Sequence, residues 1–122
     1  MQSEDVTALA IEALEALKGL DIVVLDITGK SSIADAMLVA TGTSQRHVSA
    51  LAEEVRTRAK DAGHPPLGVE GSKTGSDWTL VDLGDVIVHV MTREKRDFYA
   101  LEKLWSVEGE HGTTSIEALS AG

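Results

Sequence analysis

The chain has 122 residues, of which 43% are hydrophobic, enough for one modest core. Its formal net charge of -9 disfavours binding that depends mainly on nucleic-acid phosphates, because such binding relies on Lys and Arg side chains that release counterions. The sequence has no cysteine, no apolar leader and no apolar run of about 18 residues, so we expect a cytosolic protein without disulfides, cysteine-based metal sites or a membrane span.

The N-terminal part of the chain predicts one amphipathic helix followed by two strands. Apolar residues recur at three- and four-residue spacing over 6–17, with Ser3 in position to cap the helix and Gly19 to end it. The β-branched and apolar segments 22–27 and 37–41 then predict two strands.

A second amphipathic helix follows the small-residue loop at Gly42. Its apolar positions fall on one face over 48–62, and either Thr43 or Ser44 can cap it. The pair Pro65-Pro66 ends this helix, because proline cannot continue the helical hydrogen-bond pattern.

The remaining sequence predicts three more strands and a last helix. A short strand at 67–69 and a glycine-containing loop at 70–76 precede two strands, 78–83 and 85–91. A turn centred on Leu83 and Gly84 would place Leu80 opposite Ile87 and Trp78 opposite His89. The last helix, capped by Thr92, is expected to carry four apolar side chains: Phe98, Leu101, Leu104 and Trp105.

These elements predict an α/β fold with a single domain over 1–106, a mixed sheet of about five strands and helices mainly on one face. Two long helices are too few to cover both faces of such a sheet. We therefore expect an exposed area, formed by Trp78, Leu80, Ile87 and His89, that serves as a contact surface. Residues 107–122 are expected to form a disordered tail.

Catalytic patterns are incomplete. The segment Gly42–Ser44 before a helix is typical of a phosphate-binding turn, but Asp82 and Asp85 are separated by a turn and do not form a paired cage for divalent ions. Ser44 and His47 lie one helical turn apart, without the nucleophile motif of a hydrolase. The four histidines lack the spacing of zinc ligands, so we expect no metal site. Because each catalytic pattern is incomplete, we also expect no catalysis and no cofactor.

The charged and aromatic residues of the last helix allow two interpretations. Arg93, Lys95 and Arg96 are best explained as a solvated helix face, and the alternative is a rim that contacts phosphate or carboxylate. Trp78 and Tyr99 fit an interface as well as they fit the core.

Five groups of residues, in chain order, also resemble one known family. They are Leu25-Asp26 with Gly29-Lys30-Ser31-Ser32; Thr41-Gly42-Thr43-Ser44 with Arg46-His47-Val48; Gly68-Val69-Glu70-Gly71; Asp77-Trp78 with Val81 through Met91; and Tyr99 with Leu101-Glu102-Lys103-Leu104-Trp105. Together they cover nearly all of 6–106 and closely resemble the ribosomal silencing factor family, also called the Iojap family.

The resemblance implies a factor that binds the large ribosomal subunit at the protein numbered fourteen and blocks joining of the small subunit during starvation or stationary phase. It also implies a nucleotidyltransferase-like core that lacks the catalytic carboxylates, and a homodimer when the protein is free. Docking through the sheet face and the C-terminal helix is implied for seven positions, of which the last two are weaker rim candidates: Trp78, Leu80, His89, Tyr99, Leu101, Arg93 and Lys103.

Two other hypotheses remain open. One is a nucleotide-binding or nucleotidyltransferase-like enzyme that uses Gly42–Ser44, and the other is a dimeric scaffold that buries the Trp78 face against its own copy. The loop at 72–76 is longer than expected of many family members, and the tail after Ser106 is an addition, so the roles of both stay open.

Overall fold

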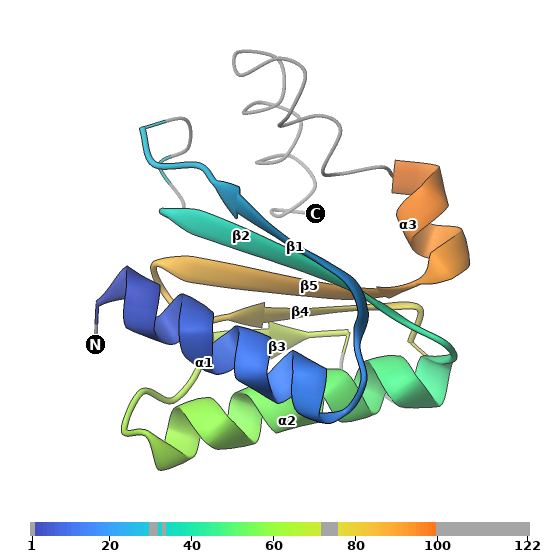
Figure 1. Ribbon diagram of the computed structural model, residues 1–122, viewed down its shortest axis with the longest axis horizontal. Helices are drawn as coiled ribbons and strands as arrows, with labels where there is room; N and C mark the ends of the chain where they lie inside the picture. The colour runs from blue at the N-terminus through green and yellow to red at the C-terminus, as the bar shows by residue number, and fades with distance from the viewer. Residues whose placement is uncertain (1, 30–31, 33, 72–75, 100–122) are drawn as a thin grey trace.

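Two long helices pack against one face of a five-stranded mixed sheet (Figure 1). The computed structural model describes residues 2–29, 32, 34–71 and 76–99. The elements in chain order are α1 (Ser3–Ala16), β1 (Leu20–Asp26), β2 (Ala36–Gly42), α2 (Gln45–Asp61), β3 (Gly68–Glu70), β4 (Trp78–Asp82), β5 (Val86–Thr92) and α3 (Arg93–Tyr99). The predicted α/β fold with its mixed sheet of about five strands is confirmed.

The sheet has the strand order β1-β2-β5-β4-β3. β2 and β5 are parallel neighbours in its centre, and the other pairs are antiparallel. β1 and β3 therefore form the two edges. Within the described ranges, none of the helices is both long and apolar enough to cross a membrane.

The two long helices begin differently from each other. Ser3 is the first residue of α1 rather than its cap, so the predicted cap is wrong. Gln2 precedes the helix, and its backbone N–H donates to Asp5 Oδ2 at 3.2 Å, which is one half of a capping box. In α2 the prediction is confirmed, because Ser44 Oγ accepts the N–H of His47 at 3.1 Å.

The main core lies between the sheet and the helices α1 and α2. Alternate side chains of the strands point toward these helices, including Val81 of β4 and Val86, Val88 and Val90 of β5. The buried side chains of this core are Val6, Ala10, Ala13, Leu14, Leu38, Ala40, Val48, Leu51, Ala52, Val55, Ala59, Val81, Leu83, Val86, Val88 and Val90.

The register of the β4–β5 hairpin differs from the prediction by two residues. Leu80 pairs with His89, and Trp78 pairs with Met91. The turn is centred on Gly84 and Asp85, because Gly84 has φ +92° and takes the first central position, where a glycine is favoured. A shift of two residues keeps every side chain on its predicted face.

The sheet face opposite α1 and α2, called the far face below, carries a second apolar cluster. Its buried members are Ile27, Ala34, Met37, Val39, Ile87 and Met91, with Leu25, Trp78 and Leu80 packed partly buried against them. The prediction that Ile87 and His89 are exposed is wrong, because both are buried. Bulky apolar neighbours on three adjacent strands enclose these two side chains, whereas Trp78 and Leu80 on β4 stay half-buried.

Candidate functional site

A hydrogen-bonded Trp–His pair lies on the far face, between β4 and β5. The indole Nε1 of Trp78 donates to Nδ1 of His89 at 2.9 Å, and the ring centroids are 5.5 Å apart at 45°. The two residues are diagonal neighbours in the sheet, because His89 stands opposite Leu80. The pair holds a half-buried tryptophan in one orientation on a face that α1 and α2 do not cover.

The imidazole of His89 is in an unusual environment for a polar group. It is fully buried, and burial lowers its pKa to about 4, so the ring is neutral at neutral pH. Because the indole N–H can only donate, Nδ1 is the acceptor and the ring proton resides on Nε2. Among the residues that the structure describes, this buried Nε2–H has no hydrogen-bond partner. An unsatisfied buried donor generally costs about 1–3 kcal/mol of folding free energy, which indicates a role of His89 beyond packing.

A buried arginine attaches α3 to the far face. Arg96 is 7% exposed, and its guanidinium donates to Thr41 Oγ1 on β2 at 2.8 Å and to the backbone carbonyl of Asp21 on β1. Charged hydrogen bonds of this kind are stronger than neutral ones. Arg96 therefore fixes the position of α3 relative to the ends of two strands.

Asp21 receives a second contact from the same helix. Arg93 Nη1 lies 3.3 Å from Asp21 Oδ2, and both side chains are mostly exposed. Asp21 has a positive φ of 47°, and the β1–β2 register is irregular between Leu20 and Val23. This bulge turns the backbone carbonyl of Asp21 to where Arg96 binds it.

The seven predicted docking residues fall into three groups. Trp78, Leu80 and His89 lie together on the far face. Arg93 and Tyr99 are the first and last residues of α3, which also contacts β5 and β2. The structure does not describe the remaining two positions, Leu101 and Lys103, or the predicted tail at 107–122.

Sequence reasoning missed Arg96. The charge pattern predicts that Arg96, together with Arg93 and Lys95, belongs to a solvated helix face, and for the buried Arg96 that prediction is wrong. The spacing does not distinguish the two arginines, because Arg96 lies three residues after Arg93 and so points to nearly the same side of the helix. Nothing in the sequence indicates that this side faces Thr41 and the bulge.

The phosphate-binding turn considered at Gly42–Ser44 borders a hollow of about 360 Å³ at the start of α2. Its polar groups already bond one another: the N–H of Thr43 donates to His47 Nδ1 at 2.9 Å, and Gln45 Nε2 donates to Asp77 Oδ1 at 2.8 Å. The hollow is lined by the carboxylates of Asp77 and Glu94, which would repel a phosphate, and by Arg93, whose charge is already paired with Asp21. This geometry disfavours the nucleotide-binding alternative.

His47 links the ends of the two long helices. Because the backbone N–H of Thr43 donates to Nδ1, the ring proton is on Nε2, which donates to the carbonyl of Leu17 at 2.7 Å. Both ring nitrogens of His47 therefore bond groups other than the Ser44 hydroxyl. Within the ranges that the structure describes, no three His, Asp or Glu side chains converge to hold a metal ion.

Comparison with solved structures gives close matches to the whole fold. A crystal structure of a protein from Chromobacterium violaceum superposes with a TM-score of 0.84 at 47% identity, covering 88% of this chain and 89% of that one. A crystal structure of a protein from Bacillus halodurans has a TM-score of 0.76 at 36% identity, covering 84% of this chain and 95% of that one. Both superpositions cover most of this chain and not only the region around Trp78.

Comparison of the sequence leads to one family. The model described as "Ribosomal silencing factor during starvation" matches residues 1–121. A relative from Haemophilus influenzae named ribosomal silencing factor RsfS is 53% identical over 96 residues, which is 79% of this chain and 93% of the relative. Plant proteins named Iojap-related, from Arabidopsis thaliana, and Iojap, from Zea mays, are also similar. The chain belongs to the ribosomal silencing factor, or Iojap, family.

Proposed function

We propose that this protein binds the large ribosomal subunit through the far face and α3, and that it thereby blocks joining of the small subunit when nutrients are scarce. The names of the relatives support a ribosomal role. The resemblance of the sequence motifs suggests the protein numbered fourteen of the large subunit as the contact. In this proposal Trp78, Leu80, Tyr99 and Leu101 form the docking surface, with Arg93 and Lys103 at its rim. The buried His89 acts beneath this surface, where it accepts the hydrogen bond of Trp78.

The observation that carries this proposal is the orientation of Trp78. Tryptophan is among the residues that most often dominate the binding energy of interfaces. The hydrogen bond from Trp78 to the buried His89 fixes the indole before a partner arrives. Less side-chain entropy is then lost on binding, which favours a preformed anchor over a mobile one.

The charge of the chain agrees with a protein contact rather than an RNA contact. A net charge of -9 is repelled by the phosphates of exposed ribosomal RNA, and it is attracted by basic protein surfaces. Repulsion from RNA and attraction to basic surfaces together favour binding to a ribosomal protein. We expect the association rate to fall as the salt concentration rises, because these long-range forces are screened.

The proposed mechanism needs no chemical step. A folded domain bound to the surface where the large and small subunits meet prevents their joining sterically. The extent of inhibition then depends on the affinity for the large subunit and on the concentration of the protein. The hydrogen bonds at the start of α2 agree with a binding role, because they leave no assembled catalytic group there.

We also propose that the protein acts in the cytoplasm and forms a homodimer when free. If the dimer used the Trp78 surface, docking on the ribosome would require dissociation, and inhibition would depend on protein concentration. Sedimentation of the free protein over a range of concentrations measures this equilibrium directly. A monomer at all micromolar concentrations would rule out the dimer without affecting the docking proposal.

Replacing Trp78 with alanine is expected to weaken binding to the large subunit by about 2 kcal/mol, roughly thirtyfold in Kd. Trp78→Phe keeps an aromatic ring but removes the N–H that bonds His89. It should therefore weaken binding less than the alanine variant. Affinity for purified large subunits, measured by co-sedimentation, gives both values.

Leu67→Ala is the matched control, because Leu67 is a large apolar side chain that is 77% exposed outside the proposed surface. It should bind as the unmodified protein does. Thermal unfolding of each variant separates a loss of contact from a loss of folding. Equal affinity of folded Trp78→Ala and Leu67→Ala would move the docking surface elsewhere.

A further inference from the structure

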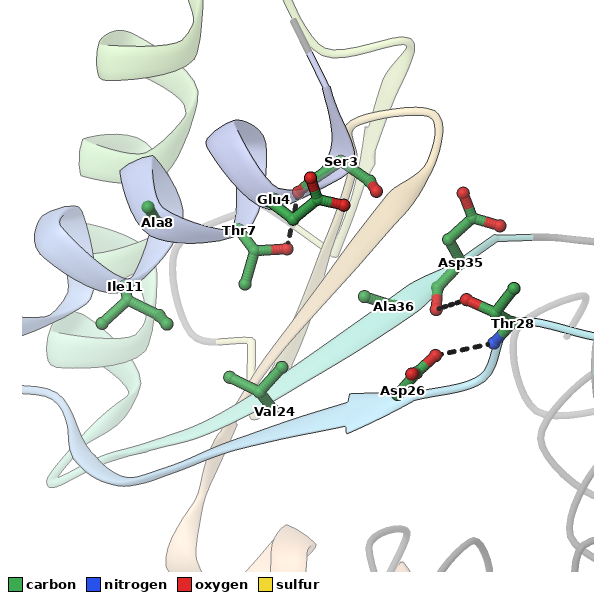
Figure 2. Close-up of a pocket in the computed structure, with 10 residues that line it drawn as sticks. All are labelled: Ser3, Glu4, Thr7, Ala8, Ile11, Val24, Asp26, Thr28, Asp35 and Ala36. Atoms are coloured by element: carbon green, nitrogen blue, oxygen red, sulfur yellow. Dashed lines mark hydrogen bonds between the residues drawn. The ribbon is translucent and has the colours of Figure 1, made fainter.

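A groove lies between α1 and the edge strand β1, on the helix-covered side of the sheet (Figure 2). Its volume is about 350 Å³, near the lower end of the roughly 300–1,000 Å³ of ligand sites in proteins. It is separated by the sheet from the Trp78 surface, since Val24 pairs with Leu38 and Ala36 pairs with Val86, both of the main core. Nothing in the proposed docking on the large subunit uses this groove.

The groove exists because β1 extends beyond the cover of α1. Val24 points to the same side of the sheet as its neighbour Leu38, which is fully buried, yet Val24 is 45% exposed. Three of the four exposed large apolar side chains in the described part of the chain gather on β1 or at the end of α1: Leu17, Leu20 and Val24. An edge strand with exposed apolar side chains is a template for another extended segment.

The two ends of the groove differ in chemistry. Figure 2 shows Ile11 of α1 and Val24 of β1 at one end, and the carboxylates of Glu4, Asp26 and Asp35 around the other. All three acidic residues are exposed, and Asp26 Oδ1 also accepts the N–H of Thr28 at 3.0 Å. An apolar floor that leads to an acidic end matches a long aliphatic side chain with a terminal cation.

We propose that this groove binds an extended, arginine- or lysine-bearing segment of a basic protein. The backbone of the segment pairs along β1, one aliphatic stem lies on Ile11 and Val24, and its cation is placed among the three carboxylates. A second copy of this chain is a poor occupant, because it carries a net charge of -9 and brings the same acidic end to the contact. Charge complementarity therefore selects a basic partner.

The test uses the full-length protein and a synthetic ten-residue peptide that alternates arginine with valine. Binding is followed by chemical-shift changes in ¹⁵N-labelled protein and by titration at low and moderate salt. We expect the largest changes at Thr7, Ile11 and Val24. The same peptide with citrulline in place of arginine keeps the shape without the charge, and it should bind at least tenfold more weakly.

The double variant Glu4→Gln with Asp35→Asn removes two charges from the groove. Its matched control is Glu12→Gln with Glu15→Gln, which removes two charges from exposed positions of α1 that do not line the groove. The groove variant should lose at least tenfold in peptide affinity, whereas the control should lose less than twofold. Equal losses would mean attraction by net charge alone and would overturn the proposal, as would shift changes centred elsewhere.

No ribosome takes part in this experiment. Its failure leaves the docking proposal for the Trp78 surface unaffected, and failure of that docking leaves this result interpretable. Val24→Ala tests the apolar end separately: weaker binding of the arginine peptide is expected, and unchanged affinity would contradict the placement of the aliphatic stem.

Discussion

Acidification from pH 6.5 to pH 4 is expected to destabilise the folded protein through His89 by on the order of 3 kcal/mol. Burial lowers the pKa of this imidazole from 6.5 to about 4 in the folded state. Above pH 6.5 the ring is neutral in both states and makes no difference to stability. Below it the unfolded chain binds a proton that the folded chain rejects, so stability falls until the pH reaches about 4.

The measurement is the free energy of unfolding by urea at a series of pH values, for the unmodified protein and for His89→Gln. Glutamine can accept the Trp78 N–H but does not titrate. The carboxylates and the other histidines contribute to both proteins, so the difference between the two curves isolates His89. Parallel curves between pH 4 and 6.5 would show that His89 is not buried as described.

Replacing Arg96 with methionine is expected to lower the free energy of unfolding by about 3 kcal/mol. The substitution keeps much of the apolar stem but removes the charged hydrogen bonds to Thr41 and to the carbonyl of Asp21. Because these bonds join α3 to the ends of β1 and β2, the helix should also exchange its amide hydrogens faster. Urea unfolding and hydrogen exchange measure the two effects.

Arg93→Met is the matched control, since it removes an arginine from the same helix and breaks only the exposed pair with Asp21. Pairs of this kind contribute about 0–1 kcal/mol, so the control should be nearly as stable as the unmodified protein. Thr41→Val removes the side-chain acceptor of Arg96 and should have an intermediate effect. Equal stability of Arg96→Met and Arg93→Met would contradict the anchoring role of Arg96.

The sequence predicts most of this fold because its helices and strands have strong, different periodicities. The three-and-four spacing before Gly19 and the β-branched residues of β5 each favour one local structure. The two errors at element ends have local causes. Asp5 contributes to a capping box that begins at Gln2, and Gly84 moves the hairpin turn by one residue.

The candidate site is less predictable because burial depends on contacts between distant segments. The sequence correctly places Trp78 and His89 on one face, since alternation along the strands determines this. It does not reveal that His89 is buried with an N–H that has no partner in the described part of the chain, or that Arg96 reaches Asp21, a residue 75 positions away. The burial of His89 depends on side chains from neighbouring strands, and the contact of Arg96 depends on how α3 meets the bulge of β1.

The most direct test of the proposed function is a subunit-joining experiment. Purified large and small subunits are mixed under conditions that favour joining, with and without saturating protein, and separated by sedimentation. We expect the unmodified protein and Leu67→Ala to hold the subunits apart, whereas Trp78→Ala at the same concentration should inhibit much less. Joined ribosomes in undiminished amount, while the protein is bound to the large subunit, would contradict the proposal.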